Sequence, residues 1–133
     1  MVRQKRVLIL DAGDRAAPAL RPLVEENGAI VECVADQDTA IVLLPHFWPD
    51  LIVIEANPDV TSGLDFCEYV RTDPDLDAVQ VVVLHSGAAP QSVDHGMALG
   101  ADAYLAAPVS SQDVAALLHE LLYDPLESDA YLA

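Results

Sequence analysis

The chain has 133 residues, 53% of them hydrophobic, which suits a single domain with a sizeable apolar core. Its 22 acidic residues against six basic ones give a net charge of −16. Binding to nucleic acid or to an anionic membrane requires a basic surface that neutralises phosphates, so this charge excludes both classes of ligand.

Short runs rich in Val, Ile and Leu predict strands, and because most do not alternate with polar residues the strands are expected to be buried on both faces. In chain order these runs cover residues 7–10, 30–35, 51–54, 79–84 and, more weakly, 103–105. Segments with apolar residues at helical spacing separate them. These segments cover residues 14–27, 37–46, 63–72, 90–99 and 110–122. The alternation predicts a parallel sheet with helices on both faces.

Local signals indicate where three of these helices begin or end. Asp36 is a predicted N-cap for the helix at 37–46, because its carboxylate can accept a hydrogen bond from a free backbone N–H. Asn27-Gly28 predicts the end of the helix at 14–27. Ser110 or Ser111 is expected to start the last helix. Trp48, between Phe47 and Pro49, is expected to cover the core.

The strand and helix pattern predicts one domain over residues 1–123, followed by a short acidic tail over 124–133. Cys33 and Cys67 lie in apolar segments without metal-ligand spacing, which is typical of free thiols in a reducing compartment. The apolar run at 7–10 is too short for an export signal or a membrane span. We therefore expect a cytoplasmic protein.

In an open parallel sheet, ligands bind at the carboxyl ends of the strands, so the residues just past the predicted strands are where function is expected. They lie in the segments 11–14, 55–57, 85–87 and 106–108. This edge of the sheet is the predicted functional site.

Three stretches of the chain resemble the receiver domain of two-component response regulators: Val7–Asp11, Pro49–Glu55 and Gly100–Pro108. The resemblance extends from about Arg6 to Leu122. It implies a flavodoxin-like three-layer sandwich, with a five-stranded parallel sheet in the order 2-1-3-4-5 and five flanking helices. It also implies a signalling module of two-component or phosphorelay type and not an enzyme.

The resemblance implies a phospho-acceptor pocket in which most of the family's chemical groups are replaced. A working receiver holds Mg²⁺ with an acidic pair, the acceptor Asp and a backbone carbonyl, and holds the phosphoryl oxygens with a Thr or Ser and a Lys. Of the acidic pair, the acid at Asp11 is kept. The other matching positions are Ala12, the acceptor position Glu55, the carbonyl position Asn57, the Thr or Ser position His85 and the Lys position Ala107. We therefore predict a degenerate pocket without catalytic residues.

These replacements remove the groups that hold metal and phosphate. Mg²⁺ needs near-octahedral oxygen ligands, and Ala12 supplies none. No cofactor is therefore expected, and Asp11 and Glu55 are the two side chains left that could hold Mg²⁺ if any did. Glu55 is one methylene longer than Asp, which moves its carboxylate away from the in-line geometry of phosphoryl transfer. We expect His85 to hydrogen-bond Asp11 or Glu55.

Three functions compete on these residues. The first is a pseudo-receiver that acts through protein–protein contacts without phosphorylation, with Glu55 either imitating the phosphorylated charge or tolerated at an inactive site. The second is a response regulator that still accepts phosphate at an altered site. The third is an enzyme or cofactor carrier on the same fold, but the acidic loop at 11–14 would repel a cofactor phosphate.

The acidic charge is concentrated in the second part of the chain. Residues 72–133 carry ten acidic side chains and no Lys or Arg. In the family this part forms the face of the fourth helix, fifth strand and fifth helix, which contacts other proteins, with Tyr104 and Pro108 as its switch and output positions. We expect Tyr104 to point outward and a basic protein partner to bind this face. A purely solubilising charge and a salt-adapted source remain alternatives, and the oligomeric state stays open.

Overall fold

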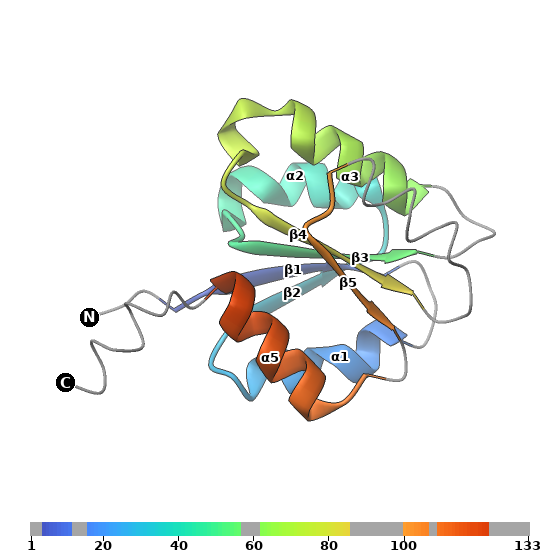
Figure 1. The fold of residues 1–133 in the computed structure, drawn as a ribbon. Helices are drawn as coiled ribbons and strands as arrows, with labels where there is room; N and C mark the ends of the chain where they lie inside the picture. Colours follow the sequence, from blue (N-terminus) through green and yellow to red (C-terminus); the bar gives the residue numbers. More distant parts are fainter. Residues whose placement is uncertain (1–3, 12–15, 57–61, 86–99, 107–108, 123–133) are drawn as a thin grey trace.

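The computed structural model describes residues 4–11, 16–56, 62–85, 100–106 and 109–122, which form a three-layer α/β sandwich (Figure 1). Strands and helices alternate along the chain, as the apolar runs predict. The elements are β1 (Arg6–Leu10), α1 (Ala16–Glu25), β2 (Ile30–Val34), α2 (Gln37–Phe47), β3 (Leu51–Ala56), α3 (Ser62–Thr72), the 3₁₀ helix η1 (Pro74–Leu76), β4 (Gln80–His85), β5 (Ala103–Ala106) and α5 (Ser111–Leu122).

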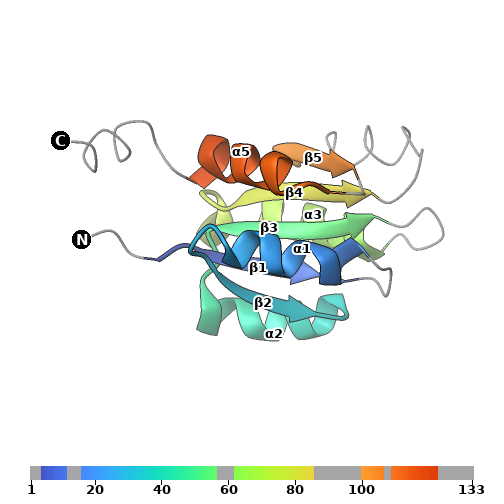
Figure 2. The same ribbon diagram turned by 90° about the horizontal axis from the view of Figure 1, so that it is seen from below.

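The five strands form one parallel sheet in the order β2-β1-β3-β4-β5, which confirms the predicted topology (Figure 2). The helices α2 and α3 cover one face of the sheet, and α1 and α5 cover the other (Figure 1). The helix predicted at 90–99 lies outside the described residues, as do the tail at 124–133 and Pro108.

Apolar side chains fill the space between the sheet and each helical layer. Along β1, Leu8 belongs to the cluster under α2 and α3, whereas Ile9 belongs to the cluster under α1 and α5. This alternation follows from the two-residue period of a strand, which sends successive side chains to opposite faces. A strand with helices on both faces must therefore be apolar at every position, which explains the unbroken Val, Ile and Leu runs.

Four of the predicted strand ends are wrong by one or two residues, and the errors at β3 and β4 matter for the site. Glu55 and Ala56 are the last residues of β3, and His85 is the last residue of β4, whereas the sequence placed them in the following loops. Parallel pairing continues through Ala56 with His85 and through His85 with Ala106. Backbone hydrogen bonding between the strands thus continues one or two residues beyond the apolar runs.

The three predicted helix signals are confirmed, whereas the expected position of Trp48 is wrong. The Asp36 carboxylate accepts from the backbone N–H of Thr39 at 2.7 Å, Ser110 Oγ accepts from Asp113 at 3.0 Å, and Gly28 follows α1 with a φ of 86°. Trp48 does not cover the core as expected, because 49% of its surface is exposed. It is instead the C-cap of α2, in the left-handed region.

The start of β5 is held to α3 and β4 by one arginine. Arg71, in the last turn of α3, donates from Nε to the carbonyl of Gly100 at 2.8 Å and forms an ion pair with Asp102. The same Asp102 carboxylate accepts from the backbone N–H of Val81 at 2.8 Å. Gly100 has a φ of 108°, and a Cβ placed there would lie 2.4 Å from Cγ of Arg71. This position therefore requires glycine.

Both cysteines are free thiols, as predicted. Cys67 is fully buried and Cys33 is half-buried, and burial raises the pKa of each thiol. Among the described helices, none has the length and apolar character needed to span a membrane.

The close contact between Arg71 and Gly100 predicts that alanine lowers the free energy of unfolding more at Gly100 than at Gly28. We expect Gly100→Ala to lower the free energy of unfolding by about 2 to 4 kcal/mol, because a Cβ adds a clash to an unfavourable φ. Gly28→Ala is the matched control: its φ is also positive, but no atom lies within 4 Å of the added Cβ, so we expect a loss of about 1 to 2 kcal/mol. Urea denaturation of both variants measures the difference, and equal losses would show that Arg71 moves aside freely.

Candidate functional site

The candidate site lies at the carboxyl edge of the sheet, where β3 ends in Glu55 and Ala56. Glu55 is paired in register with Leu84 of β4, and Leu84 belongs to the apolar cluster under α1 and α5. Val53, two residues earlier, belongs to the same cluster. The two-residue period of the strand therefore places Glu55 on the face covered by α1 and α5.

Glu55 is a buried acid without visible compensation. Only 1% of its surface is exposed, and neither carboxylate oxygen has a hydrogen-bond partner within the described part of the chain. A polar group buried without a partner costs about 1 to 3 kcal/mol, and an ionised one costs more. Within the described residues, no hydrogen bond offsets the cost of burying the Glu55 carboxylate.

Asp11, the other acid that the sequence assigns to this site, occupies the position next to Glu55 at the end of the neighbouring strand. It directly follows β1, its backbone N–H donates to the carbonyl of Val34 at 2.8 Å, and its side chain is half-buried. Leu10 is paired with Ile54, so the next residues along the two strands, Asp11 and Glu55, occupy neighbouring positions. The structure thus brings together the two acids that the sequence assigned to one site.

The other predicted site residues are placed only in part. His85 ends β4 next to Ala56 and Ala106, and its side chain is not described. Ala12, Asn57 and Ala107 lie outside the described residues. The predicted hydrogen bond from His85 to Asp11 or Glu55 therefore stays a prediction.

The described donors do not make a Mg²⁺ site. Mg²⁺ prefers six oxygen ligands in octahedral geometry. The acids that the described strands bring to this edge are Asp11 and Glu55, and no group of three or more His, Cys, Asp or Glu side chains suitable for a metal occurs in the described ranges. Both oxygens of the Glu55 carboxylate are buried, and neither has a hydrogen-bond partner among the described residues.

The predicted output face contains an exposed aromatic side chain. Tyr104 lies on the edge strand β5, paired with Val83, and 54% of its surface is exposed, which agrees with the outward position expected for it. Figure 2 shows α5 beside β5. On α5, Asp113 and Glu120 are exposed, so the described part of this face is acidic as the charge distribution predicts.

One feature was missed at the sequence level: a pocket between α2 and η1 that includes Trp48. Asp73-Pro74-Asp75, a strong turn signal, could have indicated η1, where Asp73 caps the turn by accepting from Asp75 N–H at 2.9 Å. No pattern in the sequence indicates that the two segments meet.

Comparison with known proteins identifies the family. The family described as "Response regulator receiver domain" matches residues 7–119. Protein RcaC of Microchaete diplosiphon is 28% identical over 110 residues, which are 83% of this chain and 17% of that protein. The phosphate regulon transcriptional regulatory protein PhoB of Rhizobium meliloti is 23% identical over 117 residues, which are 88% of this chain and 52% of PhoB. The chain thus spans only about half, or less, of the length of these curated relatives.

Solved structures agree on the fold. The chemotaxis protein CheY4 of Vibrio cholerae superposes with a TM-score of 0.78 at 22% identity, over 90% of this chain and 100% of CheY4. This likeness concerns the fold, and the family match over residues 7–119 gives the family. The chain belongs to the response regulator receiver domain family of two-component systems, a family of signalling modules rather than enzymes.

Proposed function

We propose that this receiver domain is a pseudo-receiver: it signals through protein–protein contacts and does not accept a phosphoryl group. Receiver domains interact with other proteins, so a signalling role needs no acceptor chemistry of its own. The observation that carries the proposal is Glu55, which stands at the acceptor position with 1% of its surface exposed and with neither carboxylate oxygen hydrogen-bonded to a described residue.

The burial of Glu55 argues against phosphoryl transfer on geometric grounds. Transfer to a carboxylate requires one oxygen in line with the leaving group of the phosphodonor, and positioning supplies most of the catalysis. A side chain that exposes almost none of its surface presents no such oxygen to a donor in solvent. The extra methylene of Glu, relative to Asp, moves the carboxylate further from the position that the family's chemistry uses.

The charges at the site argue in the same direction. A transferred phosphoryl group adds a charge of about −1.5 to −2 at neutral pH. Asp11 and Glu55 are already neighbouring acids, and the family's lysine position holds Ala107. Without that cation or a metal ion, further negative charge at this edge would be repelled.

The contact surface that we propose is the acidic face that includes Tyr104 on β5 and the exposed side of α5. Asp113 and Glu120 are exposed there, and the chain carries no Lys or Arg after residue 71. A self-paired dimer would place like charges opposite one another, which costs free energy. A partner protein with a basic surface fits this face better than a second copy of the chain.

Restoring one acid tests whether the site lacks the ligands that a receiver needs to bind Mg²⁺. We expect the chain to show no saturable Mg²⁺ binding by calorimetry at millimolar concentrations, because the donor set is incomplete. Ala12→Asp restores the missing acid of the family's pair, so we expect its affinity for Mg²⁺ to rise about tenfold. Gln112→Asp adds the same charge on exposed α5 and is the control. Submillimolar binding by the unmodified chain, or equal behaviour of the two variants, would contradict the proposal.

Replacing the buried acid tests the state of Glu55. We expect Glu55→Met to raise the free energy of unfolding by about 1 to 3 kcal/mol, because it removes an unpartnered polar group while filling similar volume. Glu55→Gln, which keeps buried polar atoms, should gain less. Urea denaturation measures both variants. A Met variant less stable than the unmodified chain would mean that the carboxylate has a strong partner and that the site is built around it.

A further inference from the structure

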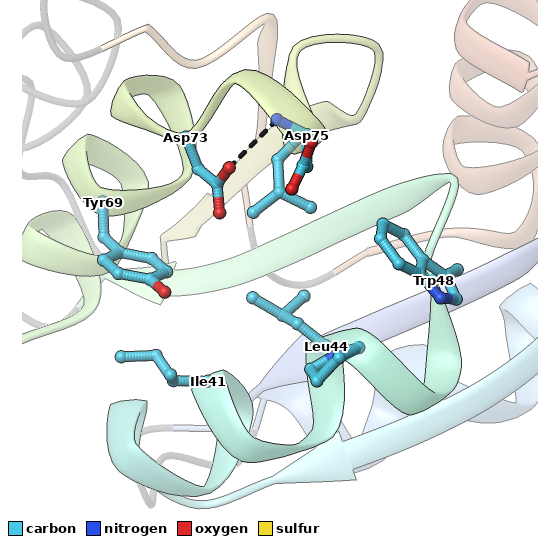
Figure 3. A pocket seen from close by; sticks show the side chains of 8 residues that line it. Ile41, Leu44, Trp48, Tyr69, Asp73 and Asp75 are labelled. Carbon is cyan, nitrogen blue, oxygen red and sulfur yellow. Dashed lines mark hydrogen bonds between the residues drawn. The ribbon is translucent and has the colours of Figure 1, made fainter.

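A pocket of about 220 Å³ lies between the C-terminal half of α2 and the segment that joins α3 to β4 (Figure 3). Its α2 side is apolar and consists of Ile41 and Leu44, with Trp48 at the end of the helix. Its other side carries the Tyr69 ring and two acids, Asp73 and Asp75. The pocket therefore joins an aromatic and aliphatic floor to an acidic rim.

Trp48 is held in this pocket at a backbone cost. It has a φ of 51° and a ψ of 68°, and its N–H donates to the carbonyl of Leu44 at 3.0 Å to close the helix. Left-handed geometry costs an ordinary L-residue about 1 to 2 kcal/mol, and glycine would avoid that cost. The indole does not recover it by full burial, because 49% of its surface is exposed. The large ring is thus presented to solvent at the mouth of the pocket.

The charged side chains that line the pocket are all acidic. Asp73 and Asp75 supply carboxylates at its rim, and the residues that line it include no Lys or Arg. Two arginines that contact or adjoin the lining segments have other partners: Arg71 binds Gly100 and Asp102, and Arg6 donates from Nη1 to the carbonyl of Phe47 at 2.8 Å. The acidic rim therefore lacks a cation from its own lining.

We propose that this pocket binds a Lys or Arg side chain, together with an adjoining apolar side chain, from a segment of a partner protein. The aliphatic stem of such a residue can lie on Leu44 and the Trp48 ring while its charged head reaches Asp73 or Asp75. A cation over an exposed indole gains further stabilisation, and Trp is the best ring for this contact.

The size of the pocket favours a side chain over a cofactor. Sites for drug-sized ligands and cofactors enclose about 300 to 1,000 Å³. At about 220 Å³ the pocket holds one or two side chains of a peptide instead. Its acids exclude phosphate-bearing ligands, and the net charge of −16 disfavours nucleic acid.

This surface is separate from the candidate site and from the acidic face of α5. Trp48 precedes the first residue of β3, whereas Glu55 lies near the last, so the pocket and the acceptor position are at opposite ends of the same strand. The inference does not rest on the proposed function, and either one can fail without the other.

Trp48 provides a direct readout, because it is the only tryptophan in the chain. The probe is an acetylated and amidated tripeptide of Leu, Arg and Leu, with Glu in place of Arg as its matched control. We expect the Arg peptide to change Trp48 emission, and to shift backbone amides within 41–48 and 69–76, with a dissociation constant on the order of 1 mM. The Glu peptide should bind at least about fivefold more weakly.

Two charge variants of the same segment localise the effect. Asp75→Asn should raise the dissociation constant of the Arg peptide about two- to fivefold, because it removes a rim carboxylate. Asp77→Asn removes the same charge from an exposed position that does not line the pocket, and should leave the constant nearly unchanged. The proposal is overturned if the Arg peptide shifts no pocket amide, if it shifts residues 100–122 instead, if the Glu peptide binds equally well, or if both variants weaken binding alike.

Discussion

Burial of the central strands on both faces is the constraint on which the rest of the structure depends. Every side chain in Val7–Leu10, Leu51–Ile54 and Val81–Leu84 is at most 3% exposed. Polar chemistry is therefore confined to strand ends, helix surfaces and connections. Glu55 is the charged side chain that breaks this rule among the described residues, and it does so one position beyond the last apolar residue of β3. Glu55 thus lies at the boundary between the buried apolar part of β3 and the carboxyl edge of the sheet, where the candidate site lies.

Apolar runs predicted all five strands, most clearly β1, β3 and β4, because a strand covered by helices on both faces must be apolar at nearly every position. The strand order came from the family resemblance, and pairing along β2-β1-β3-β4-β5 confirms it. The ends of β3 and β4 were predicted too early. Glu55 and His85 end the apolar pattern, but they still form ladder pairs, and pairing depends on the neighbouring strand rather than on the local residue type.

The sequence assigned candidate site residues through the family resemblance, but it did not indicate their environments. Asp11 and Glu55 were assigned to one site, and the register of β1 and β3 places them at neighbouring positions. The burial of Glu55, without a hydrogen-bond partner in the described part of the chain, depends on how α1 and α5 cover the sheet, which no local pattern encodes. The same holds for Trp48, whose exposure follows from the left-handed cap of α2 and from the turn of η1 opposite it. Contacts between distant segments were thus the part that sequence reasoning missed.

The central claim is that this receiver domain signals without accepting phosphate, and intact-protein mass spectrometry after incubation with acetyl phosphate and Mg²⁺ tests it most directly. A receiver with the family's usual acceptor Asp, treated in parallel, shows that the donor is active. The account predicts that the mass of this chain stays unchanged while that of the control rises by one phosphoryl group. A gain of one phosphoryl group by this chain, abolished in Glu55→Gln, would contradict it.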